Sequence, residues 1–310
     1  MLTPTQKKTA QAIVNIFETG TVLGDYGGVT VIPGDTGHLT FGRSQTTLGS
    51  GNLSRLLERY CANAGARFAA RLDADLPRFA AVDLTLDDDW KVHNTLRASA
   101  DDPVMREVQD LFFDSEYWQA AERAAGREAI DTPLGLTVVY DSIVHGSWGL
   151  IRDRTTSRVQ SRPAIDERAW IAAYVDIRRD WLGTHPRRDL RTTIYRIDAL
   201  QRLIDQGHWG LELPLVVRGM EISVATLSES PPNCYDGPQP GSRTLSQMSP
   251  LARGLDVRLL QLGLTDRSIP VVADGVYGRN SVACVREFQS MGGLPVTGVV
   301  DPQLFHRILS

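Results

Sequence analysis

Apolar residues recur at helical spacing near the start of the chain, and they predict a helix from Pro4 to Glu18. Thr3 suits the capping position, Pro4 suits the first helical position, and Gln6 completes a capping box. The apolar face of this helix consists of Ala10, Ile13, Val14 and Phe17. Glu18 therefore lies at the end of a helix, directly behind an apolar face.

Between residues 20 and 45, glycines interrupt the helical period and short runs rich in β-branched residues replace it. The runs GVTVIP and HLTFGRSQ are separated by GDTG, which is a turn sequence. This order predicts a β-hairpin that carries Asp35 in its turn.

Residues 52 to 210 return to helical periodicity almost throughout, and their helices end at glycine or polar residues. Residues 228–248 are rich in Pro, Gly and Ser with little apolar periodicity, which is typical of a linker. We therefore predict an α+β, mostly α, domain over residues 1–227 with one small β-hairpin sheet, a linker over 228–248, and a small helical module over 249–310.

Composition limits the classes of protein that fit this pattern. The chain has 310 residues, 42% of them hydrophobic and 23% charged, so it can bury one full-sized core and a second small one. A formal net charge of -4 and a pI near 5.9 argue against a nucleic-acid partner. The sequence has no run of eighteen apolar residues and no conventional signal-peptide pattern. We expect a soluble monomer that is made in the cytoplasm without a signal peptide and does not enter a membrane.

The C-terminal module contains an ordered set of four motifs, RLLQLGL, ADGVYG, REFQ and GLPVTGVVD. This set resembles the peptidoglycan-binding domain that is appended to many bacterial wall hydrolases. The resemblance covers nearly the whole module and implies a three-helix fold that binds peptidoglycan glycan strands. The stretch VVDPQLF departs from the usual pattern, which has a glycine and a threonine before the last helix.

Motifs spread over residues 3 to 225 resemble the chitosanases of glycoside hydrolase family 46, which belong to the lysozyme superfamily. The segment QAIVNIFE resembles their helix that ends in a catalytic Glu, and GDTGHLTFG resembles the following hairpin with its catalytic Asp. The later segments VVYDSIVHG, AAYVDIRRDWL and YRIDALQR resemble further family segments. The resemblance implies a two-lobed, lysozyme-like catalytic domain.

Glu18 and Asp35 are therefore the candidate catalytic pair. Glycoside hydrolysis needs one carboxylic acid to protonate the leaving oxygen and a second carboxylate on the opposite side of the sugar. Glu18, beside apolar residues, suits the general acid, and Asp35, on a polar turn, suits the general base. The resemblance implies an inverting mechanism. Asp25, in the glycine-rich loop GDYGG, is the rival base or a substrate-binding residue.

The same resemblance implies supporting residues around the catalytic pair. Thr40 is similar to a family threonine that helps to place the attacking water. Three residues are similar to a buried ion network that runs toward the catalytic Glu: Asp141, Arg178 and Arg196. We expect His145, in YDSIVHG, to order a loop beside the substrate cleft.

Asn52 is an informative departure from the family pattern. The chitosanases place an acidic residue at this point to meet the ammonium group of glucosamine, whereas GSGNLSRLLERY has a neutral amide. An amide cannot compensate a cationic amine, but it can form hydrogen bonds with an acetamido or hydroxyl group. Asn52 could also serve only as the cap of the next helix. Together with the wall-binding module, the missing acid favours N-acetylated peptidoglycan over chitosan as substrate.

Other catalytic classes find little support in the sequence. The six histidines form no HExxH motif and no close pair at metal-ligand spacing. Three cysteines, Cys61, Cys234 and Cys284, are odd in number and far apart, and no GxSxG motif occurs. We therefore expect neither a metal nor another cofactor, and no serine or cysteine nucleophile.

The sequence thus predicts a muramidase-like peptidoglycan hydrolase, which we expect to cut after N-acetylmuramic acid. The alternatives are a chitosanase that carries a wall-binding module and a non-catalytic wall-binding adaptor. Without a signal peptide, such a hydrolase needs another route to the periplasm or the cell wall. A phage holin system and a contact-dependent secretion apparatus are the two alternatives. We therefore expect either a bacteriolytic endolysin or a secreted effector. A secretion component or an immunity protein would then be a further partner.

Overall fold

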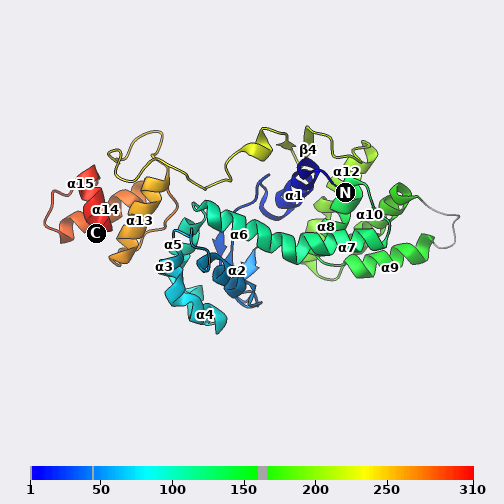
Figure 1. The fold of residues 1–310 in the computed structure, drawn as a ribbon, viewed down its shortest axis with the longest axis horizontal. Helices are drawn as coiled ribbons and strands as arrows, with labels where there is room; N and C mark the ends of the chain where they lie inside the picture. Colours follow the sequence, from blue (N-terminus) through cyan, green and yellow to red (C-terminus); the bar gives the residue numbers. More distant parts are fainter. Residues whose placement is uncertain (1, 44, 160–165) are drawn as a thin grey trace. The chain divides into compact units, whose positions relative to one another are not determined.

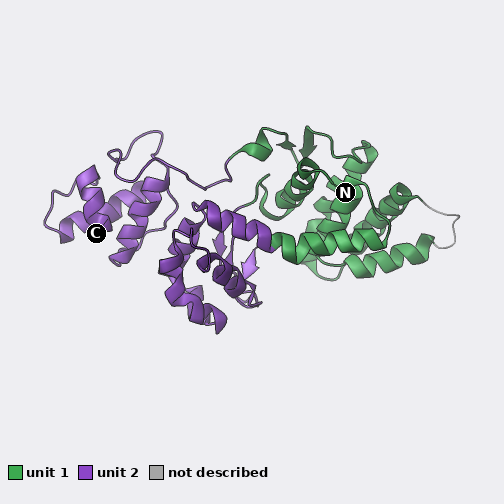
Figure 2. Cartoon of the chain, viewed as in Figure 1, with its two compact units in different colours: residues 1–24, 113–229 green, residues 25–112, 230–310 purple. Residues whose placement is uncertain are grey.

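The computed structural model describes residues 2–43, 45–159 and 166–310. The chain divides into two compact units, and neither of them is continuous in sequence (Figure 2). Unit 1 comprises residues 1–24 and 113–229, and unit 2 comprises residues 25–112 and 230–310. The chain therefore crosses between the units three times, and each unit is described separately below.

Unit 1 begins with helix α1 (Pro4–Thr19), and its start confirms the predicted capping box. The Thr3 hydroxyl accepts a hydrogen bond from the Gln6 amide, while the Gln6 side chain accepts one from the Thr3 amide. Gly20 ends the helix in the left-handed conformation, with φ of 70°, which glycine adopts without strain. Glu18 is therefore held in the last turn of a helix that is fixed at both ends.

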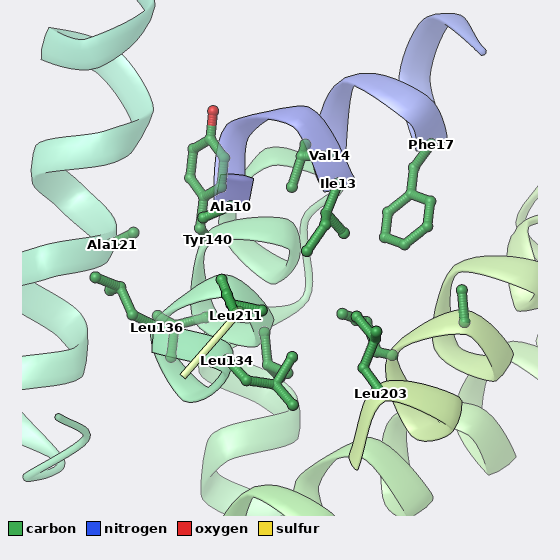
Figure 3. Close-up of a cluster of buried hydrophobic side chains, with 14 of the residues drawn as sticks. Ala10, Ile13, Val14, Phe17, Ala121, Leu134, Leu136, Tyr140, Leu203 and Leu211 are labelled. Carbon is green, nitrogen blue, oxygen red and sulfur yellow. The ribbon is translucent and has the colours of Figure 1, made fainter. Parts of the chain in front are cut away.

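Helix α8 (Pro133–Val144) lies at the centre of unit 1. Helices α1, α7 (Gln119–Arg127), α10 (Glu167–Gly183) and α12 (Tyr195–Asp205) pack around it (Figure 1). Nine of its twelve residues are buried, which explains why its sequence is apolar nearly all round. Figure 3 shows apolar side chains of α1 directed toward Leu134 of α8 and Leu203 of α12. This core fixes the end of α1 relative to the polar residues of α8, α10 and α12.

The remaining elements of unit 1 are short, except for helix α9. They are the π-helical segment η3 (Asp114–Trp118), α9 (Trp148–Val159), α11 (Arg188–Arg191), η4 (Thr192–Ile194), β4 (Leu215–Val217), β5 (Met220–Ile222) and η5 (Thr226–Ser228). Strands β4 and β5 form an antiparallel hairpin in which Val217 pairs with Met220. The sequence pattern did not predict this second hairpin.

The sheet of unit 2 confirms the predicted hairpin and adds a third strand. Strands β1 (Val29–Thr30), β2 (Thr40–Phe41) and β3 (Thr46–Thr47) are antiparallel in the order β1-β2-β3. Thr40 pairs with Thr30 on one side and with Thr47 on the other. The long connection between β1 and β2 carries Asp35.

Helices of unit 2 cover the apolar residues of this sheet. They are α2 (Asn52–Cys61), α3 (Ala69–Leu72), η1 (Asp73–Asp75), α4 (Leu76–Ala80), η2 (Leu84–Asp87), α5 (Trp90–Ser99) and α6 (Pro103–Phe113), of which the last residue belongs to unit 1. Their buried side chains, such as Leu56, Phe79 and Leu96, form one core with Phe41 of β2. The predicted mostly helical α+β class is therefore confirmed.

The C-terminal module has the three predicted helices, α13 (Leu255–Asp266), α14 (Arg279–Met291) and α15 (Pro302–Leu309). Its own core includes Leu260, Val285 and Phe305. Leu262 and Ala273, however, are fully buried within the core formed by residues 39–112. Unit 2 thus contains both the small sheet and the C-terminal module.

Part of the predicted linker is ordered against its surroundings in unit 2. The Tyr235 amide donates to Asp101, Asp236 pairs with Arg106, and Leu245 exchanges two backbone hydrogen bonds with Val300. The boundaries 1–227, 228–248 and 249–310 remain a prediction. Among the described residues, no helix is both long and apolar enough to cross a membrane.

Candidate active site

Glu18 projects from the last turn of α1 in unit 1, and 26% of its side chain is exposed. Its Oε1 lies 2.7 Å from Nη1 of Arg196, which comes from α12. The Arg196 guanidinium also lies over the ring of Phe17, 5.2 Å from its centre. Tyr195 donates a hydrogen bond to the Phe17 carbonyl, which ties the start of α12 to the end of α1. The carboxylate is therefore anchored on its helix and oriented by a neighbouring arginine.

Asp141 of α8 joins Arg196 to a second buried arginine, Arg178 of α10. Arg196 donates to one oxygen of Asp141 through Nε at 3.0 Å and Nη2 at 2.6 Å, and Arg178 donates to the other oxygen at 2.6 Å. None of the three side chains is more than 2% exposed. Burial alone would raise the pKa of Asp141, but the two guanidinium groups hold it below its usual range. The predicted ion network is therefore formed, and it contacts Glu18.

His145, the C-cap of α8, extends this network. Its Nδ1 lies 3.2 Å from Nη2 of Arg178 and accepts a hydrogen bond from it. Burial, followed by repulsion from Arg196 and Arg178, lowers the pKa of His145 to about 4. The imidazole is consequently neutral near pH 7, as an acceptor for an arginine must be.

Asp35 lies in unit 2, in the exposed connection between β1 and β2. Asp87 holds the far end of this loop, because it accepts hydrogen bonds from the Leu39 amide and pairs with His38, both at 2.8 Å. Gly49 holds its middle: the Gly49 amide donates to Gly37, and a Cβ at Gly49 would lie 2.2 Å from the Thr36 carbonyl oxygen. The backbone that carries Asp35 is thus fixed from two sides, while its carboxylate faces solvent.

Thr40 and Asn52 belong to the same unit as Asp35. The Thr40 hydroxyl donates to the His38 carbonyl at 3.1 Å, and its oxygen retains the capacity to accept. Asn52 is the first residue of α2, whose N-cap is Gly51, so the alternative that Asn52 caps this helix is wrong. The Asn52 carbonyl oxygen instead accepts a hydrogen bond from Arg55 at 3.1 Å.

Asp25 lies in a different environment from Asp35. Its Oδ1 accepts a hydrogen bond from the Gly27 amide, and the side chain lines a cavity together with Arg97 and Arg258. Asp35 does not line this cavity. The two rival bases therefore face different surroundings within unit 2.

The structure brings one set of predicted residues together in unit 1, namely Glu18, Asp141, His145, Arg178 and Arg196. The other set, Asp25, Asp35, Thr40 and Asn52, lies in unit 2. The sequence reading missed three residues that act on the second set: Asp87, Gly49 and Arg55. Only Arg55 had a usable signal, since residues three apart on a helix are neighbours. Among the described residues, no cluster of three or more His, Cys, Asp or Glu could hold a metal ion.

These features define a mostly helical carbohydrate hydrolase with an attached wall-binding module, and the comparisons with known proteins identify its family. The family model of glycosyl hydrolase family 46 matches residues 12–215, so the chain belongs to this family and is a glycoside hydrolase. A peptidoglycan binding domain model matches residues 253–308, which confirms the predicted C-terminal module.

The relatives that the chain matches are chitosanases. A chitosanase of Bacillus subtilis (strain 168) is 28% identical over 231 residues, which cover 70% of this chain and 83% of that protein. The native chitosanase of Bacillus subtilis MY002 superposes with a TM-score of 0.60 at 26% identity, covering 70% of this chain and 96% of that one. A family 46 chitosanase of Gynuella sunshinyii, solved in complex with chitotetraose, gives 0.58 at 28% identity, covering 72% and 99%.

Proposed function

We propose that this glycoside hydrolase cleaves glucosamine-containing β-1,4 glycans of the chitosan type. The observation that carries the proposal is the match to chitosanases over about 70% of the chain. This match favours the alternative prediction, a chitosanase that carries a wall-binding module, over the prediction of a muramidase-like peptidoglycan hydrolase. The C-terminal module would then hold the enzyme at a wall surface.

In this proposal Glu18 is the general acid and Asp35 the general base. Glu18 would protonate the leaving oxygen, and Arg196 would act as a positioning residue that holds the carboxyl group through the 2.7 Å contact. Asp35, exposed on its anchored loop, would take a proton from the attacking water, with Thr40 accepting or donating a hydrogen bond to that water. An inverting outcome requires such a water between acid and base.

Hydrolysis of soluble chitosan tests these assignments directly. Glu18→Gln and Asp35→Asn should each lower kcat by about 10² to 10⁴-fold, because each removes one proton-transfer group. Asp25→Asn should retain most of the activity. The opposite pattern, with Asp25→Asn inactive and Asp35→Asn active, would move the base to Asp25. The anomer released first, measured by NMR, reports inversion or retention.

Peptidoglycan is a second candidate substrate, and the surroundings of Asn52 favour it. The Asn52 carbonyl oxygen is occupied by Arg55, so the Asn52 side chain offers N–H donors beside a positive charge. A glucosamine ammonium group would be repelled there, whereas an acetamido carbonyl could accept a hydrogen bond. The peptidoglycan binding domain supports the same substrate.

Parallel assays on soluble chitosan and on dye-labelled sacculi separate the two candidates. Turnover of chitosan alone supports the first proposal, and release of dye from sacculi supports the second. Asn52→Asp should then shift the preference toward chitosan, because the carboxylate supplies a negative charge that can pair with the ammonium group of glucosamine. Binding to sacculi without turnover of either substrate would contradict both proposals and favour the wall-binding adaptor.

A further inference from the structure

Unit 2 contains a cavity of about 340 Å³ where residues 25–112, the small lobe, meet the C-terminal module. The loop 25–29 and Arg97 of α5 form one wall. Arg258, Val272 and Asp274 of the module contribute to the other. The cavity is therefore made by two parts of the chain that belong to different sequence families.

Buried polar contacts fix both walls. Asn94 of α5 donates to Thr265 and to the Val271 carbonyl and accepts from the Ala273 amide, at 3.0, 2.7 and 2.9 Å, and it is 1% exposed. Arg258, 2% exposed, donates to the carbonyls of Arg97 and Ala273. These buried hydrogen bonds, together with the apolar core that Leu262 and Ala273 share with residues 39–112, hold the module against this part of the chain.

Arg97 supplies a cation that forms no salt bridge among the described residues. Its side chain is half-buried, and within the described residues no carboxylate oxygen lies within 4.0 Å of its guanidinium nitrogens. Burial, and then repulsion by the neighbouring Arg258, lowers the pKa of Arg97, and attraction to Asp274 offsets this shift only in part. By contrast, Arg258 has Asp101 at 3.1 Å.

Two carboxylates in the cavity wall have one free oxygen each. Oδ1 of Asp25 accepts from the Gly27 amide, and Oδ1 of Asp274 accepts from Gln261 and from the Val276 amide. In the described part of the chain, Oδ2 of Asp25 and Oδ2 of Asp274 have no hydrogen-bond partner. Val29, Val272 and Val276 add apolar surface to the lining of the cavity.

We propose that this junction cavity binds an amino-acid-like group that carries a carboxylate and an ammonium on a short aliphatic chain. The carboxylate would pair with Arg97, and the ammonium with Asp25 or Asp274. A simple anion would leave both carboxylates unpaired, and a simple cation or a neutral sugar would leave Arg97 without a salt bridge. A diamino acid in the peptide stem of peptidoglycan has this chemistry, which agrees with the family of the module.

This proposal goes beyond the proposed hydrolysis, since it concerns a separate site. Calorimetric titration of the full chain with meso-diaminopimelate at pH 7 and low salt tests it. Arg97→Gln should weaken binding about tenfold to a hundredfold, as expected for the loss of a charged hydrogen bond. Val272→Trp should abolish binding by filling the cavity, and the fold should tolerate it because Val272 is 50% exposed. Arg279→Gln, at the exposed start of α14 and outside the cavity, is the matched control.

Chemically modified forms of meso-diaminopimelate test which charged groups of the ligand the cavity requires. Loss of binding after N-acetylation and also after amidation of the carboxylates supports a site that needs both charges. Binding that survives N-acetylation overturns the proposal in favour of an anion site, and no binding of the unmodified probe overturns it altogether. Hydrolysis of chitosan by the same samples is measured in parallel, so failure at this site and failure of the proposed activity are distinguishable.

Discussion

At the scale of single residues, Asp141 holds the arginine that contacts Glu18. It is fully buried between Arg178 and Arg196, and its removal would leave Arg178 without a carboxylate partner and Arg196 with Glu18 alone. Asp141→Asn should therefore lower the free energy of unfolding by about 3 to 5 kcal/mol. It should also reduce hydrolysis, because Arg196 would no longer be held beside Glu18. Chemical denaturation followed by circular dichroism measures the first effect.

Asp198→Asn is the matched control for this prediction. Asp198 pairs with Arg179 on the surface, where both side chains are about half exposed. Exposed pairs contribute about 0 to 1 kcal/mol, so this variant should remain close to the wild type. Equal losses in the two variants would contradict the structural role of the buried network.

Asp101 gives a prediction about pH. Burial raises the pKa of Asp101 to about 6, even though Arg258 opposes this shift. The folded protein therefore keeps this proton to a higher pH than the unfolded chain, whose aspartates titrate near pH 3.9. Between about pH 4 and 6 unfolding releases the proton, so this group makes the free energy of unfolding decrease as pH rises. Asp101→Asn should flatten that part of the stability profile, and an unchanged slope would contradict the assignment.

At the scale of elements, the loop between β1 and β2 depends on Gly49. A Cβ at this position would lie 2.2 Å from the backbone oxygen of Thr36, so the loop that carries Asp35 would have to move. Gly49→Ala should cost about 1 to 3 kcal/mol of stability, as overpacking does, and should lower kcat on chitosan. Gly126→Ala is the control, since a Cβ at this position near the end of α7 would meet nothing within 4 Å and alanine favours a helix. Wild-type kcat in Gly49→Ala would show that the loop tolerates displacement.

At the scale of the whole molecule, unit 2 joins residues that are distant in sequence. Asn94 makes three buried hydrogen bonds to the C-terminal module. Asn94→Ala should destabilise unit 2 by roughly 3 kcal/mol or more, because several buried groups lose their partners. Proteolysis between residues 233 and 246 should also become faster, since this segment is held where the lobe and the module meet. Asn280→Ala, exposed on α14, should change neither property.

The sequence by itself determined the local elements and the family. Capping residues and apolar spacing specify α1, and the turn sequence around Asp35 specifies the β1–β2 hairpin. Such signals are readable because they act between residues a few positions apart. The motifs of both domains were readable for the same reason, and the family matches confirm them.

Only the tertiary structure decided which distant side chains meet. The contacts of Asp87 with His38, of Asn94 with the module, and of Arg97 with the junction cavity join residues 49 or more positions apart. Nothing in local periodicity encodes such pairings, because they arise when separate elements bury their apolar faces together. The division into two units has the same origin, because each unit is defined by the residues that share a core. Residues 25–112 share a core with the C-terminal module and not with their neighbours in sequence.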